Sequence, residues 1–437
     1  MKQKNLRLEY TKIKDIVIAI LLSIWIIIPL LKMIKCTSLF TVIYEYKFME
    51  IACIIGTCFF AIDIYNKIKK CENKKELLKA MIPIIILGLY LCWTLVSCIF
   101  ASNKESAFYG TSGRRDGYVT YLIYAGFFLS AFSISSNKIK KILLNLFIII
   151  ATLNIYLMLL VKNNTILLNY INYKEIKLGV FYNSNHYGYY LTLASTLACI
   201  LFITEKNKII KILYAIAYIT LVYNLILNNT LGCYIAVSTT IVIFTIYCIY
   251  NKKYRVFSII SILIFIIISC IIQINGKNIV SKNIKGLTND AKSIINSNKE
   301  NTNWEKAGSG RAKLWKYGII IFMQKPILGY GAENLEVEYV KYNINQDRPH
   351  NLIIQLATTS GLPGLLLYIS GIGLILFRGL KRLKEDDNTY IAVYFTVIAY
   401  LISAMFGNSM YYTSPYFFIL LGFIMNKKFE KKYWHLL

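Results

Sequence analysis

The chain has 437 residues, of which 57% are hydrophobic and only 16% are charged. Apolar runs such as 16–31 and 259–272 are too long for soluble cores and indicate membrane helices. So large an apolar fraction also excludes a disordered chain. The formal net charge of +27 points to a nucleic-acid partner only if the cations are gathered on one binding surface.

Twelve candidate membrane spans of roughly twenty residues each follow one another along the chain. They lie near 16–31, 48–65, 79–100, 117–135, 142–161, 181–204, 209–227, 230–250, 256–273, 352–377, 390–408 and 411–426. Ionisable residues are nearly absent inside these ranges, as expected where a bare charge in hydrocarbon costs several kcal/mol. The sequence therefore predicts an all-α, polytopic membrane protein.

The cations concentrate on one side of this predicted membrane. More than half of the 49 Lys and Arg residues lie in the two terminal tails and in the loops after the even-numbered spans. By the positive-inside rule, both termini are cytoplasmic and the protein is a multi-pass protein of the cell membrane. The basic excess thus orients the chain, and we expect no nucleic-acid partner. We predict an N-terminal bundle (1–273), an extracytoplasmic segment (274–351) and C-terminal spans with a cytoplasmic tail (352–437).

Arginines on the predicted outer side are candidates for binding an anion. Arg311 follows a Gly-Ser-Gly turn and begins a stretch, 311–323, whose apolar spacing predicts an amphipathic helix on the membrane surface. If Ser309 caps this helix, the N-terminal amides and Arg311 together suit a phosphate. Arg114 and Arg115 form a guanidinium pair that can hold a pyrophosphate. Equally, all three arginines can simply contact lipid headgroups.

Two histidines and three asparagines accompany the arginines on the predicted outer side. His350 and His186 each lie beside the entrance to a span, and a neutral imidazole suits removal of a proton from a hydroxyl near pH 7. The polar residues Asn183, Asn185 and Asn351 can bind sugar hydroxyls or phosphate oxygens, or can satisfy helix ends. No outer D-x-D or C-x-x-C pattern occurs, so we expect neither a metal nor a cofactor.

Four short motifs occur in a fixed order between residues 305 and 370. They read Arg311-x-x-x-Trp315, Pro326-x-x-Gly-x-Gly331, His350-Asn351 and Gly361-x-x-Gly364. This order, together with the span layout, resembles the O-antigen ligase and Wzy-type polysaccharide polymerase superfamily. The resemblance extends more weakly to Arg114-Arg115-x-Gly117 and Asn183-x-Asn185.

The resemblance implies a membrane C-type glycosyltransferase that is metal-independent and inverting. Its donor would be a glycan on polyprenyl (undecaprenyl) pyrophosphate, and its acceptor a hydroxyl of a glycan, lipid or wall polymer. Arg311 matches the family's phosphate-binding arginine and His350 its catalytic histidine, while Arg115 or Arg114 would be a second pyrophosphate ligand. The alternative is a transporter or flippase, which usually has polar or broken helices at mid-membrane depth.

Overall fold

The computed structural model describes residues 2–433, apart from 35–41, 71–72, 112, 163, 169–170, 172–174, 176, 182, 296–303, 386 and 409. The described residues are mostly helical and contain no β-strand, only an isolated bridge between Ile34 and Ile171. The predicted all-α class is therefore confirmed.

Each of the twelve predicted spans coincides with one long or apolar helix. These are α1 (Lys2–Met33), α2 (Val42–Lys70), α3 (Lys74–Ile99), α5 (Tyr118–Ser133), α6 (Asn137–Lys162), α8 (Ser184–Thr204), α9 (Lys208–Asn228), α10 (Leu231–Tyr250), α11 (Arg255–Ile272), α15 (Leu352–Leu380), α16 (Asn388–Ala404) and α17 (Ser414–Tyr433). Within the described ranges, nine of these helices are long and apolar enough to cross a membrane. The apolar parts of α5, α16 and α17 are shorter, so a total of twelve crossings stays a prediction.

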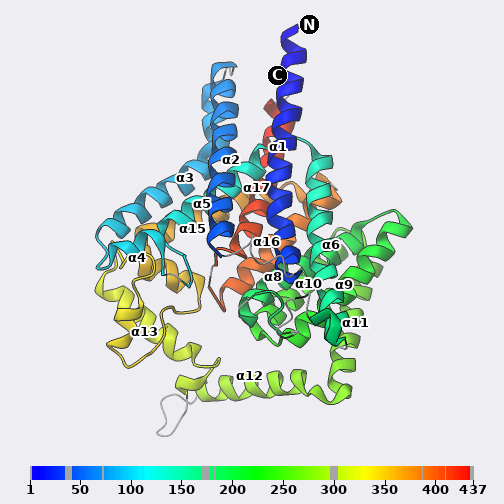
Figure 1. Cartoon of the computed structure of the whole chain (residues 1–437), viewed down its shortest axis with the longest axis vertical. Coiled ribbons are helices and arrows are strands. Elements are labelled where there is room, and N and C mark those ends of the chain that lie inside the picture. The colour runs from blue at the N-terminus through cyan, green and yellow to red at the C-terminus, as the bar shows by residue number, and fades with distance from the viewer. Residues whose placement is uncertain are drawn as a thin grey trace.

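Shorter helices lie between the spans. They are α4 (Lys104–Tyr109), α7 (Thr165–Leu168), α12 (Ile279–Ile295), α13 (Arg311–Gln324) and α14 (Glu336–Val340). In Figure 1 the N-terminus and the C-terminal end of the chain are at the top, whereas α12 and α13 are at the bottom. The long segment before α15 thus lies at the opposite end of the bundle from both termini, as the alternation of the loops predicted.

Helix α8 forms the centre of the bundle. Its apolar window is completely buried, and it packs against α9, α16 and α10. Small side chains such as Ala194, Ser195 and Ala198 let the neighbouring helices approach closely, which is how helices associate where water supplies no driving force. The first turn of α8 therefore holds its side chains in a fixed place at the end of the bundle that carries α12 and α13.

Helix α15 is broken at Gly361, where the backbone has φ 66° and ψ −177°. The break frees carbonyl groups, and the amides of Tyr330 and Gly331 bind those of Thr358 and Thr359 at 2.9 and 2.8 Å. The Trp93 indole donates to the Ser360 carbonyl at 2.9 Å. The Pro-x-x-Gly-x-Gly and Gly-x-x-Gly motifs therefore pack on each other as a structural corner.

Replacing Gly361 with Ala should destabilise this corner. The φ/ψ region is open almost only to glycine, and an added Cβ would collide with the Ile327 carbonyl oxygen. Strain and overpacking each cost on the order of 1–3 kcal/mol, so we expect a loss of about 2–4 kcal/mol in the free energy of unfolding. Gly373→Ala, on the same helix with no atom within 4 Å of its added Cβ, is the control. Equal melting temperatures for the two purified variants would contradict the expectation.

Candidate functional site

Most of the predicted site residues meet at the end of the bundle that carries α12 and α13. The electrostatic neighbours of His350 are Arg311, Arg114 and Arg348, and those of His186 include Arg348, Arg114 and His350. These residues come from α8, α13, the loop before α5 and the loop before α15. Helix packing alone brings them together, since up to 236 residues separate them in the sequence.

Arg311 begins α13, as predicted, and its guanidinium donates hydrogen bonds to two backbone carbonyl oxygens. Nε donates to Phe406 O at 3.2 Å and Nη1 to Gly308 O at 3.0 Å. No carboxylate pairs with it among the described residues, although the side chain is half-buried. Its charge is therefore oriented by backbone but not neutralised, and it can accept an anion.

The prediction that Ser309 caps α13 is wrong. Gly310 is the N-cap, with no side-chain hydrogen bond, because residues 308–310 all have positive φ. The amides of Arg311 and Ala312 instead donate to the carbonyls of Gly308 and Ala307, at 3.3 and 3.2 Å.

One face of α13 packs on protein. Leu314 and Ile321 are buried in a small cluster with Tyr330, Leu335 and Tyr339. The opposite side carries the exposed side chains of Ile319 and Met323. Contact of α13 with lipid stays a prediction. The side of the helix that carries Ile319 and Met323 is the part of its surface that can make this contact.

The two adjacent arginines have different surroundings. Arg114 Nη1 lies 2.7 Å from Asp347 Oδ2. Arg115 has φ 48°, and its guanidinium lies over the Tyr46 ring, 5.2 Å from the centroid. It forms no ion pair with any described carboxylate. Of the two candidates, Arg115 keeps its charge unpaired, while Arg114 is held at the His350 and His186 side of the site.

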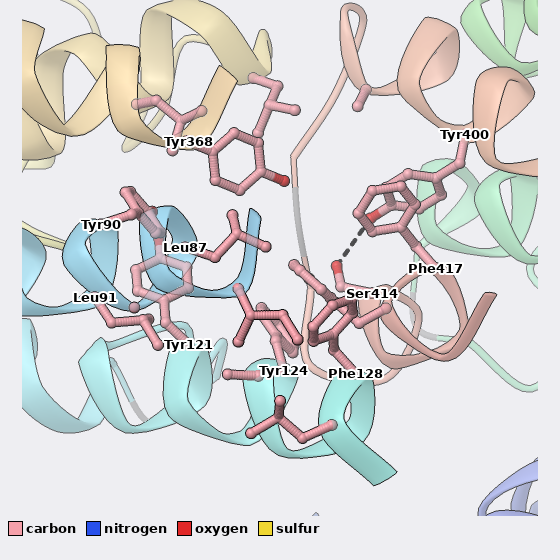
Figure 2. Close-up of a pocket in the computed structure, with 18 of the residues that line it drawn as sticks. Leu87, Tyr90, Leu91, Tyr121, Tyr124, Phe128, Tyr368, Tyr400, Ser414 and Phe417 are labelled. Atoms are coloured by element: carbon pink, nitrogen blue, oxygen red, sulfur yellow. Dashed lines mark hydrogen bonds between the residues drawn. The ribbon is translucent and has the colours of Figure 1, made fainter. Parts of the chain in front are cut away.

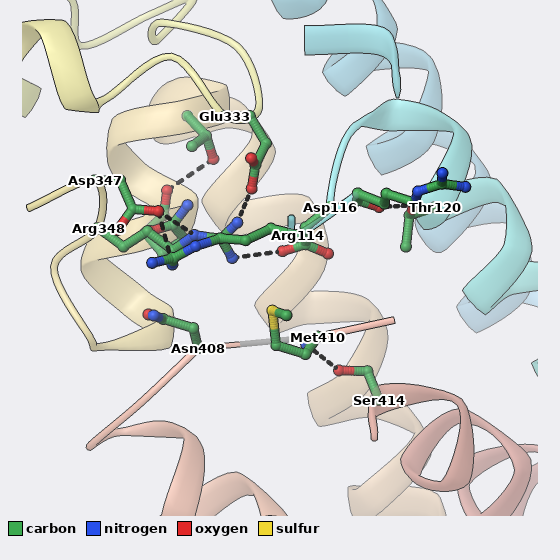
Figure 3. A network of polar contacts seen from close by, with 12 residues as sticks. Arg114, Asp116, Thr120, Glu333, Asp347, Arg348, Asn408, Met410 and Ser414 are labelled. Carbon is green, nitrogen blue, oxygen red and sulfur yellow. Dashed lines mark hydrogen bonds and ion pairs between the residues drawn. The ribbon is translucent and has the colours of Figure 1, made fainter. Parts of the chain in front are cut away.

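A buried ion-pair cluster, which the sequence analysis missed, lies behind Arg114. Arg348 Nη1 is 2.8 Å from Asp116 Oδ2, Nη2 pairs with Glu333, and Nε is 3.4 Å from Asp347 (Figure 3). The Arg348 side chain is only 3% exposed. This cluster joins the loop before α5 to the segment before α15 and so sets the position of Arg114. Arg348 lies two residues before His350 in the sequence, but nothing there links it to carboxylates as distant as Asp116.

Replacing Arg348 with Met should cost about 3–5 kcal/mol of unfolding free energy, because breaking a buried pair leaves uncompensated carboxylates. Lys341→Met is the matched control. Its ion pair with Glu338 is 2.6 Å long but the lysine is 58% exposed, so its loss should cost less than about 1 kcal/mol. Thermal unfolding of both purified variants measures the difference. A melting temperature of Arg348→Met equal to that of Lys341→Met would show that the cluster is not stabilising.

His350 is fixed by its backbone and by Asn408. The residue has φ 52°, and its Nδ1 lies 3.1 Å from Asn408 Nδ2. Burial, followed by the positive charges of Arg311, Arg114 and Arg348, lowers the pKa of His350 to about 4. The imidazole is therefore neutral near pH 7 and keeps a lone pair for a proton.

His186 lies in the first turn of α8 and is buried. Its ring meets Tyr412 edge to face, with centroids 5.3 Å apart. Its Nδ1 is buried without a hydrogen-bond partner among the described residues. A buried and unsatisfied ring nitrogen beside His350 is consistent with the predicted substrate contact.

The predicted asparagines lie at helix starts. Asn183 Oδ1 accepts from the Asn185 amide at 2.8 Å and caps α8. Asn351 caps α15 through the amides of Ile353 and Ile354, and its Nδ2 donates to Met405 O at 3.1 Å. Asn183 is exposed and Asn185 half-exposed. Capping thus accounts for Asn183 and Asn351, and a role of any of the three in substrate binding stays a prediction.

The loop between α16 and α17 was missed in the sequence analysis although it contacts Arg311 and both histidines of the site. Phe406 O accepts from Arg311, Asn408 contacts His350, and Tyr412 lies against His186. The available signal was the polar pair Gly407-Asn408 between two apolar spans on the predicted outer side. Within the ranges that the structure describes, no group of three or more His, Cys, Asp or Glu side chains is arranged to hold a metal ion.

An apolar cavity opens beside this site, between α3, α5, α15, α16 and α17 (Figure 2). Its volume is about 140 Å³, and tyrosines and leucines supply most of its lining. Figure 2 shows Tyr90, Tyr121, Tyr124, Tyr368 and Tyr400 around the space. The lining also includes Leu352 and Gln355 from the first turn of α15, directly after His350 and Asn351. The cavity therefore begins at the turn of α15 that follows His350 and Asn351.

The fold and the site together define a polytopic membrane protein with an arginine- and histidine-lined site at one end of its helices. Residues 216–369 match the family model described as O-antigen ligase. Over these residues the chain is similar to that family, and the predicted resemblance is confirmed. The matched part includes Arg311, His350 and the corner at Gly361. No curated protein matches the sequence.

Proposed function

We propose that this protein transfers a glycan from polyprenyl pyrophosphate to an acceptor hydroxyl at the outer face of the cell membrane, in the synthesis of a cell-surface polysaccharide. The family match supports a glycan-transferring ligase or polymerase. The finer proposal rests on the proximity of Arg311 to His350. Arg311 has no described carboxylate partner, and His350 is neutral. The reaction needs positive charge to stabilise its anionic leaving group, and it needs a base to take the proton of the acceptor hydroxyl.

Arg311 binds the pyrophosphate in this proposal. Charge develops on the pyrophosphate as the glycosidic bond breaks, and a preoriented guanidinium stabilises it. Arg115 is the better second ligand by charge because it is unpaired, whereas Arg114 must first exchange Asp347 for phosphate. No metal is needed for this step if two arginines supply the positive charge.

The polyprenyl chain enters the apolar cavity in this proposal. The cavity lining is mostly leucine and aromatic, which suits an isoprenoid chain, and it begins at the first turn of α15. A donor whose pyrophosphate is at Arg311 would then place its lipid between the membrane helices. The pyrophosphate and the polyprenyl chain of one donor would then lie in adjacent polar and apolar surroundings.

His350 acts as the general base. It takes the proton of the acceptor hydroxyl while that oxygen attacks the anomeric carbon, and the bond from this carbon to the pyrophosphate oxygen breaks with its electron pair going to the pyrophosphate. A single displacement inverts the configuration at the anomeric carbon. His186, Asn183, Asn185 and Asn351 would contact sugars of the donor or acceptor.

Asn408 decides which ring nitrogen of His350 can serve as the base. With Nδ2 donating to Nδ1, the proton of the neutral ring is on Nε2. Asn408 Oδ1 is meanwhile buried without a described hydrogen-bond partner. A half-turn of the amide would let Oδ1 accept from Nδ1–H and would free Nε2 for the acceptor. We infer that Asn408 adopts this second orientation when the acceptor binds.

The broken helix α15 gives the transporter alternative its strongest support, because transporters often place ion sites at such breaks. The carbonyls released at Gly361 are, however, already bound. Tyr330, Gly331 and Trp93 donate to Thr358, Thr359 and Ser360. A break whose carbonyls are satisfied by neighbouring backbone and indole groups offers no ligands to a cation.

Reconstitution with a defined donor tests the proposal. Purified protein in lipid vesicles would receive a glycan on polyprenyl pyrophosphate and an acceptor glycan, with and without a metal chelator. We expect release of polyprenyl pyrophosphate, transfer that the chelator leaves unchanged, and an inverted anomeric linkage by NMR. Flipping of the donor across the vesicle membrane without transfer would instead establish the alternative.

A further inference from the structure

Helix α12 is almost detached from the rest of the protein. It begins after a π-helical turn, Gln273–Lys277, at the end of α11 and runs across the ends of the membrane helices (Figure 1). Along its length it makes few polar contacts with other described elements. Asn283 Nδ2 donates to Asn229 Oδ1 at 3.0 Å, and Asp290 accepts from the Gly308 amide at 2.9 Å. Most of its other residues are exposed.

One stripe of α12 is apolar. Val280, Ile284, Leu287, Ala291 and Ile295 recur at intervals of three and four residues, which places them along one side of a helix. The exposed fractions are 56% for Ile284, 41% for Leu287 and 79% for Ile295. A helix of 17 residues is marginal in water unless its apolar side is covered. Something outside the described chain must therefore cover this stripe.

The rest of α12 is basic. Lys282, Lys285 and Lys292 are all exposed. Asp290 is the single acidic residue of the helix, and it already binds the Gly308 amide. An apolar stripe beside exposed lysines is the pattern of a helix that lies in a membrane interface, with its cations at the phosphates of lipid headgroups.

We propose that α12 docks on the outer lipid surface of the membrane, with its apolar stripe at the boundary between headgroups and acyl chains. The surface is continuous with a membrane span, since α11 has exposed apolar side chains up to its end, among them Ile267, Ile271 and Ile274 just beyond it. Lipid that covers these side chains reaches the start of α12. This continuity, together with the lysines, favours lipid over a protein partner.

Docking of α12 also bears on Arg311. Asp290 of α12 holds the Gly308 amide, and the Gly308 carbonyl in turn accepts from Arg311 Nη1 at 3.0 Å. Fixing α12 on the lipid surface therefore fixes the depth of the Arg311 turn relative to the membrane. This consequence rests on the proposed function, whereas the docking itself does not.

Fluorescence quenching by brominated lipid tests the docking independently of any transfer assay. Leu287→Trp places an indole on the stripe, and Lys285→Trp places one on the basic side as the matched control. Each full-length variant is reconstituted as one chain per nanodisc, in anionic lipid with brominated or ordinary acyl chains. Both variants share the same five native tryptophans, so the difference between them reports the added indole.

We expect brominated lipid to quench the added indole in Leu287→Trp severalfold more than that in Lys285→Trp. Equal quenching of the two variants would overturn the proposal. This is also the result expected if a second copy or another protein normally covers the stripe, because each disc holds a single chain without such a partner. If Leu287→Trp aggregates, Ile284→Trp on the same stripe replaces it. Failure of the glycan-transfer assay with normal quenching would contradict the proposed function and leave the docking standing.

Discussion

His350→Asn should lower kcat/KM for glycan transfer by about 10²- to 10⁴-fold, the usual contribution of a positioned general base. Asn tolerates the left-handed backbone that His350 adopts at φ 52°, so this substitution removes the base with little strain. His350→Ala would lose the same activity but would add strain. Initial rates of polyprenyl pyrophosphate release, measured on variants with wild-type melting temperatures, give the result.

His350→Gly serves as the control for backbone effects, since glycine adopts positive φ freely. Asn and Gly variants should lose activity equally. Wild-type activity in His350→Asn would eliminate His350 as the base, and His186 would then be the next residue to test, because it is the other buried imidazole of the site.

The pH dependence has a defined sign. The pKa of His350 is lowered to about 4, so the base is neutral above that pH and becomes protonated, and inactive, below it. The acid limb of kcat/KM should therefore lie near pH 4 rather than near the usual histidine value of about 6.5. Arg311→Met removes one of the three positive neighbours of His350, so the acid limb of its residual activity should move to higher pH. An acid limb at the same pH in the wild-type protein and in Arg311→Met would show that the observed ionisation is not that of His350.

Arg311→Met should lower kcat/KM by about 10²- to 10³-fold, as removal of one preoriented donor to a developing oxyanion does. Met keeps the length of the side chain but cannot bind pyrophosphate. Arg311→Lys should recover only part of the loss, because lysine lacks the planar fork that holds two phosphate oxygens and the Phe406 and Gly308 carbonyls together.

Lys313→Met is the matched control for Arg311→Met. Lys313 lies in the same first turns of α13 and pairs with Glu305 at 2.9 Å. Its loss should change the rate by no more than about twofold, in line with the small effect of surface ion pairs. Equal losses in the two variants would show that α13 supplies a general positive field and that Arg311 makes no specific contact.

The membrane helices could be predicted because their signal is local. Each span is a run of apolar residues whose length must match the bilayer, and each loop carries the charge bias of its side. The start of α13 at Arg311 was predicted for a similar reason, since a Gly-Ser-Gly turn precedes an amphipathic stretch. Ser309 was misjudged because capping depends on backbone dihedrals, and the three consecutive positive φ values of residues 308–310 cannot be read from residue types.

Helix α12 escaped the sequence analysis although its signal was present. Its apolar residues recur at helical spacing, but lysines and a glycine between them lower the mean hydropathy below that of a span. Periodicity, rather than average hydropathy, would have found it.

Local patterns in the amino-acid sequence thus specify the all-α membrane fold and the order of its helices, because burial in lipid acts on runs of neighbouring residues. Short motifs in the same sequence single out Arg311 and His350 as candidates. The pairing of residues far apart follows from helix packing. Packing separates Arg114, paired with Asp347, from Arg115, which pairs with no carboxylate in the part of the chain that the structure describes. It also buries Arg348 among Asp116 and Glu333 and places Asn408 against His350. Such contacts have no local sequence signature. A buried charge requires a partner, but that partner can lie at any distance along the chain.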